Sequence, residues 1–144
     1  MDQTEGTRDI AAGPAEVMAV IAGFEAYPEW ADVRSAKVLE RDAEGRGSRV
    51  AFEVSAAGMT AAYTLSYRYL PGHAGVSWTT EEAQGAVKDV SGGYELEEQD
   101  GTTSVTYRLA VETSMPLPGF LRRQAEKKIV KTALDGLKRR VEEG

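Results

Sequence analysis

Six consecutive segments in the middle of the chain have the residue pattern of β-strands. The clearest is Arg49–Ala56, in which Val50, Phe52 and Val54 alternate with polar or small residues. Such alternation is typical of antiparallel strands that bury one face. The six predicted strands are Arg34–Arg41, Arg49–Ala56, Thr60–Leu70, Val76–Glu81, Val87–Glu98 and Thr103–Thr113. Turn residues separate them, so we expect an antiparallel meander with one apolar face.

The chain before this meander predicts one more strand and two short helices. Thr4–Ala12 alternates weakly, as a strand does, and apolar residues at helical spacing predict a helix over Ala15–Phe24. Glu25–Ala31 suits a second short helix or a turn. Within the later meander, Gly92-Gly93 predicts a bulge or a strong bend, because glycine in a strand often marks one.

The last segment, Phe120–Val141, predicts one long amphipathic helix. At about 100° per residue, its apolar side chains form one broad arc. The residues of this arc are Ala125, Ile129, Val130, Ala133, Leu134, Gly136, Leu137 and Val141. Ala125, Ala133 and Gly136 are small, which indicates either the close approach of a neighbouring element or room for a ligand.

Together these elements predict an α+β domain. The long helix and the short helix pair are the elements able to cover the apolar face of a seven-stranded antiparallel sheet. A chain of 144 residues with 42% hydrophobic residues is long enough to form one core. We therefore expect a single domain over residues 1–144.

The predicted buried face of the sheet is rich in tyrosine and tryptophan. Its residues are Val38, Val50, Phe52, Val54, Tyr63, Leu65, Tyr67, Val76, Trp78, Tyr94, Leu96, Val105, Tyr107, Leu109 and Val111. A buried hydroxyl without a hydrogen-bond partner costs about 1–3 kcal/mol. The tyrosines therefore indicate either a wet or ligand-filled cavity, or positions near strand ends where the hydroxyls reach solvent. Apolar walls with a few polar groups are typical of a small-molecule site.

The composition excludes several kinds of site. The chain has no cysteine, which excludes disulfides, thiol chemistry and Cys-ligated metals. Its one histidine, His73, lies in a Pro-Gly turn, where we expect it to be exposed. We therefore predict no metal site and no cofactor. No segment has the apolar length of a membrane span, and the polar N-terminus is unlike a secretory signal, so we expect a cytoplasmic protein.

The charge is unevenly distributed along the chain. Eight of the 17 basic residues but two of the 23 acidic residues lie between Phe120 and Arg140. The acidic remainder argues against nucleic-acid binding. The basic helix face is either solvated or a contact for an anionic partner.

Glu126 is unusual because it lies inside the apolar arc of the last helix, with Arg122 one turn earlier. One interpretation is an ion pair between these two residues near the start of the helix. The other is a polar group at the mouth of a cavity. The residues alone leave both interpretations open.

Three short motifs resemble those of a known family: Tyr27-Pro28-x-Trp30 after the first helix, Val76-Ser77-Trp78 in a central strand, and Pro118 to Arg123 (PGFLRR) at the start of the last helix. The chain resembles, over nearly its whole length, small bacterial polyketide cyclase/dehydrase-like proteins of the START-like (SRPBCC) superfamily. The resemblance implies a helix-grip fold, in which a seven-stranded antiparallel sheet wraps around a long C-terminal helix, with two short helices after the first strand. It also implies a hydrophobic tunnel between sheet and helix.

The resemblance and the aromatic face together predict binding of a polyketide-, aromatic- or lipid-like small molecule. The alternatives are a polyketide cyclase, aromatase or dehydratase, and a ribosome- or membrane-associated module that uses the basic helix. The expected ligand-binding residues are Trp30, Phe52, Val54, Tyr63, Leu65, Tyr67, Trp78, Tyr94, Tyr107, Leu109, Ala125, Ile129 and Ala133. We identify no catalytic residue. We expect no nucleic-acid partner and no integral membrane contact, and a monomer or a homodimer.

Overall fold

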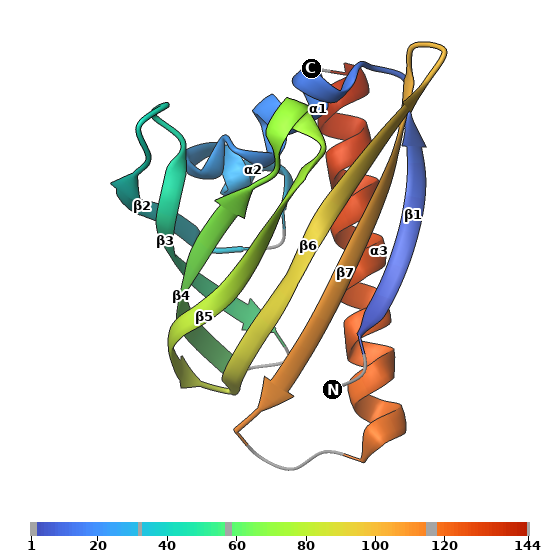
Figure 1. Ribbon diagram of the computed structural model, residues 1–144. Coiled ribbons are helices and arrows are strands. Elements are labelled where there is room, and N and C mark those ends of the chain that lie inside the picture. Colours follow the sequence, from blue (N-terminus) through green and yellow to red (C-terminus); the bar gives the residue numbers. More distant parts are fainter. Residues whose placement is uncertain (1–2, 32, 57–58, 115–117, 144) are drawn as a thin grey trace.

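The computed structural model describes residues 3–31, 33–56, 59–114 and 118–143 (Figure 1). The strands are β1 (Thr4–Ile10), β2 (Ser35–Arg41), β3 (Gly47–Ala56), β4 (Met59–Tyr69), β5 (Gly75–Gly85), β6 (Val87–Gln99) and β7 (Thr102–Thr113). The α-helices are α1 (Pro14–Ile21), α2 (Tyr27–Trp30) and α3 (Gly119–Glu143), and the short 3₁₀ helices are η1 (Phe24–Ala26) and η2 (Pro71–His73).

The seven strands form one antiparallel sheet in the order β1-β7-β6-β5-β4-β3-β2. Strands β2 to β7 form a meander, because strands that follow one another in the chain are also neighbours in the sheet. The first strand pairs with the last, from Thr4 opposite Leu109 to Ile10 opposite Thr103. The sheet curves around α3 in Figure 1, which confirms the predicted α+β helix-grip fold.

Helix α3 packs mainly against β1 and β7, and its second half also contacts α1 and α2. Two glycines allow α3 to approach its neighbours closely: Gly6 of β1 and Gly136 of α3 itself. A Cβ at Gly6 in β1 would lie 2.8 Å from Val130 Cγ1, and a Cβ at Gly136 would lie 2.5 Å from the carbonyl oxygen of Trp30. For Gly136, the small residue in the apolar arc therefore reflects the close approach of α2, not room for a ligand.

The core lies on the concave face of the sheet, between the strands and the helices. Its most deeply buried side chains are Ile10, Val17, Ile21, Phe24, Val50, Val76, Val105, Leu109, Leu134 and Leu137. Each aliphatic side chain buried in this way contributes about 1.5–3 kcal/mol relative to exposure. This apolar contact holds α1, η1 and α3 on the sheet.

Strand β5 is longer than predicted, since it continues beyond Glu81 to Gly85. Of the bulge or strong bend predicted at Gly92-Gly93, the bulge is wrong: β6 stays in register with β7 there and shifts between Val87 and Asp89 instead. The bend stays a prediction. Glycine is required at position 92 because a Cβ would overlap the carbonyl oxygen of Arg108.

The pairing of β5 with β6 ends at Trp78 and Gly92. Beyond this pair, the hydroxyl of Thr80 links the two strands. It accepts a hydrogen bond from Val90 N at 2.7 Å and donates one to Val90 O at 2.6 Å.

Candidate ligand-binding site

Three aromatic side chains meet at the centre of the concave face. Trp78 in β5 lies 5.6 Å from Tyr94 in β6 and 5.6 Å from Tyr107 in β7, measured between ring centroids. The rings of Tyr94 and Tyr107 are 4.6 Å apart. They meet because Tyr94 is directly opposite Tyr107 in the β6–β7 ladder, and cross-strand partners share a face.

A second group of rings comes from the helical segment after α1. Phe24 and Tyr27 lie over Phe52 of β3, at 6.2 and 5.9 Å, and Tyr27 contacts Trp30 at 4.8 Å. Tyr67 of β4 joins the two groups, since it lies 4.7 Å from Phe24 and 5.7 Å from Trp78. We call this set the aromatic cluster: Phe24, Tyr27, Trp30, Phe52, Tyr63, Tyr67, Trp78, Tyr94 and Tyr107.

The aromatic cluster contains polar atoms without partners. The indole N–H groups of Trp30 and Trp78 are buried and make no hydrogen bond. Among the described residues, the hydroxyls of Tyr63, Tyr67, Tyr94 and Tyr107 also make no hydrogen bond, but their oxygen atoms are not fully enclosed as the two indole nitrogens are. By contrast, the Tyr27 hydroxyl donates to the carbonyl of Ile21. A buried donor left unpaired costs about 1–3 kcal/mol, so the interior has an unused capacity for hydrogen bonds.

Burial determines the protonation of these tyrosines. Loss of water raises the pKa of Tyr67, Tyr94 and Tyr107 well above the ordinary value, and their neighbouring hydroxyls add to the effect. Burial also raises the pKa of Tyr63 to about 12. The hydroxyls therefore keep their protons at neutral pH. They can donate hydrogen bonds but cannot act as bases.

The structure brings most of the predicted site residues together. Six are buried on the concave face: Phe52, Leu65, Trp78, Tyr94, Tyr107 and Leu109. Four are half-buried and pack against the core: Trp30, Tyr63, Tyr67 and Ala133. Val54 is half-buried but is not part of this packing. The other two, Ala125 and Ile129, lie on an exposed side of α3, where Ile129 is 44% exposed.

Two members of the aromatic cluster were not predicted as site residues. Phe24 and Tyr27 lie in the segment assigned to short helices, and their helical spacing alone gives no sign of contact with β3 and β4. The sequence signal that could have identified them is the density of aromatic residues between positions 24 and 30.

Both interpretations of Glu126 are wrong. Its side chain is 2% exposed, and both carboxylate oxygens accept hydrogen bonds. One bond comes from the Thr4 hydroxyl at 2.7 Å and the other from Val111 N at 2.8 Å. Glu126 therefore ties α3 to β1 and β7, and its carboxylate is neither paired with Arg122 nor free at a cavity mouth.

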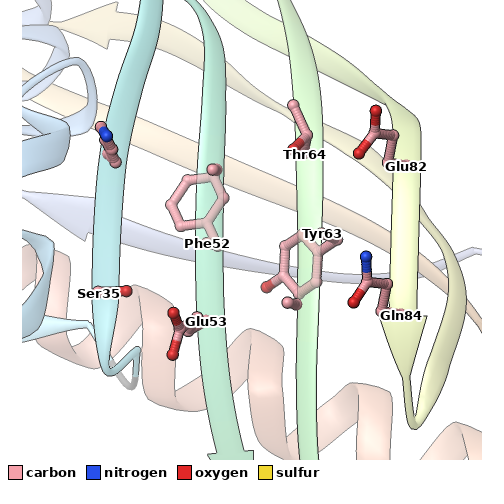
Figure 2. Close-up of a pocket in the computed structure, with 10 residues that line it drawn as sticks. Ser35, Phe52, Glu53, Tyr63, Thr64, Glu82 and Gln84 are labelled. Atoms are coloured by element: carbon pink, nitrogen blue, oxygen red, sulfur yellow. The ribbon is translucent and has the colours of Figure 1, made fainter.

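Two depressions stand out on the described part of the molecule, and both lie outside the concave face. The larger, of about 240 Å³, is on the opposite face of β2–β5, as Figure 2 shows with α3 behind the sheet. Its lining includes two cross-strand rows, Ser35-Glu53-Ala62-Gln84 and Lys37-Ala51-Thr64-Glu82. Phe52 and Tyr63 of the aromatic cluster also border it. The smaller, of about 150 Å³, lies between β1 and α3, beside Arg8, Lys127 and Lys131. The cavity expected between sheet and helix thus stays a prediction.

Other classes of site find no support in the described residues. They contain no group of three or more His, Asp or Glu side chains placed to hold a metal ion. His73 is exposed in η2, as predicted. None of the described helices is long and apolar enough to cross a bilayer.

The fold is shared with solved structures of low sequence identity. A START superfamily protein from Mycobacterium smegmatis matches with a TM-score of 0.89 and 20% identity, covering 98% of this chain and 97% of the other. A Thermus thermophilus protein matches with a TM-score of 0.80 and 22% identity, covering 99% and 98%. The ZhuI aromatase/cyclase from a Streptomyces species matches with a TM-score of 0.79 and 18% identity, covering 98% and 93%.

No curated protein matches the sequence significantly. The sequence does match, over residues 1–142, the family described as polyketide cyclase / dehydrase and lipid transport. This match spans the sheet, the short helices and all but the last residue of α3. The chain therefore belongs to the polyketide cyclase/dehydrase and lipid transport family.

Proposed function

We propose that this protein binds a hydrophobic small molecule against the aromatic cluster on the concave face of its sheet. One observation carries the proposal: a buried aromatic surface contains the unpartnered indole N–H of Trp78 beside the unpartnered hydroxyls of Tyr94 and Tyr107. A ligand that accepts a hydrogen bond from the buried indole N–H of Trp78 removes the cost of leaving it unpaired, and the two hydroxyls offer the ligand further hydrogen bonds.

The chemistry of the cluster favours a planar ligand with acceptor oxygens. Aromatic side chains pack well against flat rings, in offset or edge-to-face arrangements. The indole N–H is a donor, and the high pKa of the tyrosines keeps their hydroxyls protonated. A polyketide-like or quinone-like molecule carries both flat rings and carbonyl acceptors, so it complements this surface.

Helix α3 supplies the opening in this proposal. Ile129 lies on nearly the same side of the helix as Gly136, since seven residues make about two turns. Gly136 is covered by Trp30, whereas Ile129 is 44% exposed and Ala125, one turn earlier, is exposed as well. This uncovered apolar side of α3 gives the ligand a path toward the concave face.

A second candidate is an aromatase or cyclase reaction on the same kind of ligand. It is favoured by the same donors, because a protonated hydroxyl such as that of Tyr107 can polarise a substrate carbonyl. One similar structure is described as an aromatase/cyclase, and the family description includes cyclases. In this case the tyrosines act as hydrogen-bond donors, and a different group must remove any proton from carbon.

Tryptophan fluorescence tests the binding proposal directly, because Trp30 and Trp78 are the chain's two tryptophans and both belong to the aromatic cluster. We expect a hydroxyanthraquinone such as emodin to quench this fluorescence saturably. The Tyr107→Phe variant should bind about fivefold to tenfold more weakly, because one hydrogen bond is worth about 1 kcal/mol.

Tyr69→Phe is the matched control, because the Tyr69 hydroxyl already donates to Gly47 O at 2.8 Å, outside the aromatic cluster. It should bind emodin as the unmodified protein does. Quenching that never saturates, or equal loss of affinity in both variants, would contradict the proposed site. Turnover of a poly-β-ketone substrate that Tyr107→Phe abolishes, with binding retained, would support the enzyme candidate instead.

A further inference from the structure

The first half of α3, residues 119–130, has an exterior unlike the rest of the described surface. Three of the five large hydrophobic side chains that are exposed on the described chain lie here: Phe120 at 59%, Leu121 at 42% and Ile129 at 44%. The sheet and α2 cover none of them. Figure 1 shows the first turns of α3 extending past the start of β1, at the end of the molecule away from α1.

The same half-helix carries positive charge that the protein does not neutralise. Arg122, Arg123, Lys127 and Lys128 have no ion-pair partner among the described residues. In the second half of α3, by contrast, Lys131, Lys138 and Arg140 all have carboxylate partners.

No acidic side chain offsets this charge on the outside of residues 119–130. The one acidic residue in that stretch is Glu126, which is 2% exposed and bonded to Thr4 and Val111. The rest of the chain is strongly acidic, so the positive end is a local feature of a negatively charged protein.

We propose that the exterior of residues 119–130 is a docking surface for an anionic lipid bilayer. Exposed Phe and Leu side chains next to Lys and Arg are typical of helices that lie in the membrane interface. The apolar side chains enter the boundary between headgroups and acyl chains, while the basic side chains attract anionic headgroups. The docking is peripheral and needs no membrane-spanning segment.

The mixture of side chains favours lipid over RNA as the partner. RNA binding rewards basic side chains and flat aromatic rings, which stack on bases. It gives little to an exposed aliphatic group such as Leu121, whereas a bilayer gains from burying it. This inference goes beyond the proposed small-molecule site, and it is tested without any ligand.

Co-sedimentation of the full chain with vesicles tests the proposal. We expect the protein to sediment with mixed phosphatidylcholine–phosphatidylglycerol vesicles at low salt, and far less with phosphatidylcholine alone. The double variant Lys127→Gln/Lys128→Gln should partition roughly 25-fold more weakly, at about fivefold for each charge lost near an anionic surface. Phe120→Ser/Leu121→Ser should lose at least about tenfold, since two apolar side chains no longer insert.

Two matched variants control for general effects. Leu39→Ser/Leu70→Ser removes leucines that are 41% and 40% exposed on other parts of the surface. Arg139→Gln removes an exposed basic residue at the other end of α3, again one without an ion-pair partner among the described residues. Both proteins should partition within about twofold of the unmodified chain, because these positions are outside the docking surface. Circular dichroism would verify that every variant is folded.

The inference would be overturned by equal sedimentation with neutral and anionic vesicles. It would also be overturned if Phe120→Ser/Leu121→Ser sedimented normally, or if the leucine control lost as much binding. Displacement from vesicles by RNA in the unmodified protein, with no effect of the Phe120 and Leu121 substitutions, would assign the basic surface to RNA instead.

Discussion

The two halves of α3 are attached to the sheet by different kinds of interaction. The second half, residues 131–143, is fixed by packing: Leu134 and Leu137 are fully buried, and Gly136 sits against Trp30. The first half buries Val130 and otherwise depends on the two hydrogen bonds of Glu126.

This difference teaches that one continuous helix can be both a core element and an exposed surface. Polar contacts reinforce the packing of the second half, such as the 2.7 Å bond from Lys138 Nζ to Asp9 O and the Arg140–Glu29 ion pair at 3.0 Å. The first half lacks such reinforcement on its outer side, which leaves its hydrophobic and basic side chains available for other contacts. The predictions below test this division.

Alkaline pH should have the largest effect, because it acts on the aromatic cluster that supports the second half through Trp30. Burial raises the pKa of Tyr67, Tyr94 and Tyr107 in the folded protein above the unfolded value of about 10. The contribution of these protonated tyrosines to the stability of the fold is therefore complete below pH ~10, and it is lost as the pH rises through their pKa values in the folded protein. We expect cooperative unfolding above pH ~10, followed by circular dichroism and by tyrosinate absorbance.

In that titration the two signals should change together, because the buried tyrosines ionise only when the chain unfolds. Tyrosinate absorbance that rises fully while the circular dichroism stays native would show that the cluster is open to solvent.

Shortening Leu137 should have the next largest effect. Leu137→Ala leaves a cavity in the packed half, and we expect it to lower the free energy of unfolding by about 2–5 kcal/mol. Ile129→Ala makes a similar change on the exposed side of the first half and should cost less than about 0.5 kcal/mol. Urea denaturation measures both values. Equal losses in the two variants would remove the distinction between the halves.

The smallest effect should come from the polar tether. Glu126→Met keeps a side chain of similar length but removes both acceptor oxygens, so the Thr4 hydroxyl and Val111 N lose their partner. We expect a loss of about 1–3 kcal/mol and faster amide hydrogen exchange over residues 119–130 than over 131–143. Gln124→Ala, at an exposed position two residues away, is the control and should change neither measurement. Uniform exchange along α3 in the Glu126 variant would contradict a local tether.

The fold could be predicted because strand alternation and helical periodicity are local signals. Val50, Phe52 and Val54 show their common face in the sequence itself, and the structure buries Val50 and Phe52. The end of β5 could not be predicted, since the residues after Glu81 are polar or small and their strand geometry depends on pairing with β4.

The candidate site was only partly predictable, for a similar reason. The site residues on the strands could be predicted, because alternate residues of a strand share a face. Phe24 and Tyr27 could not, because they join the aromatic cluster through the placement of η1 and α2 over β3. The partners of Glu126 are 122 and 15 positions away in the chain, so its burial has no local signature. Burial of a carboxylate needs such partners, and sequence spacing does not reveal them.

The backbone pairing between β5 and β6 is shorter than the pairing between the other neighbouring strands of the meander. Past Trp78 and Gly92, the two hydrogen bonds of the Thr80 hydroxyl stand in place of the regular ladder, so we expect a change in the angle between β2–β5 and β6-β7-β1 to break few hydrogen bonds there. If a larger ligand requires the two parts of the sheet to separate at Thr80, we expect the loss of the two Thr80–Val90 hydrogen bonds and not of a whole strand pairing.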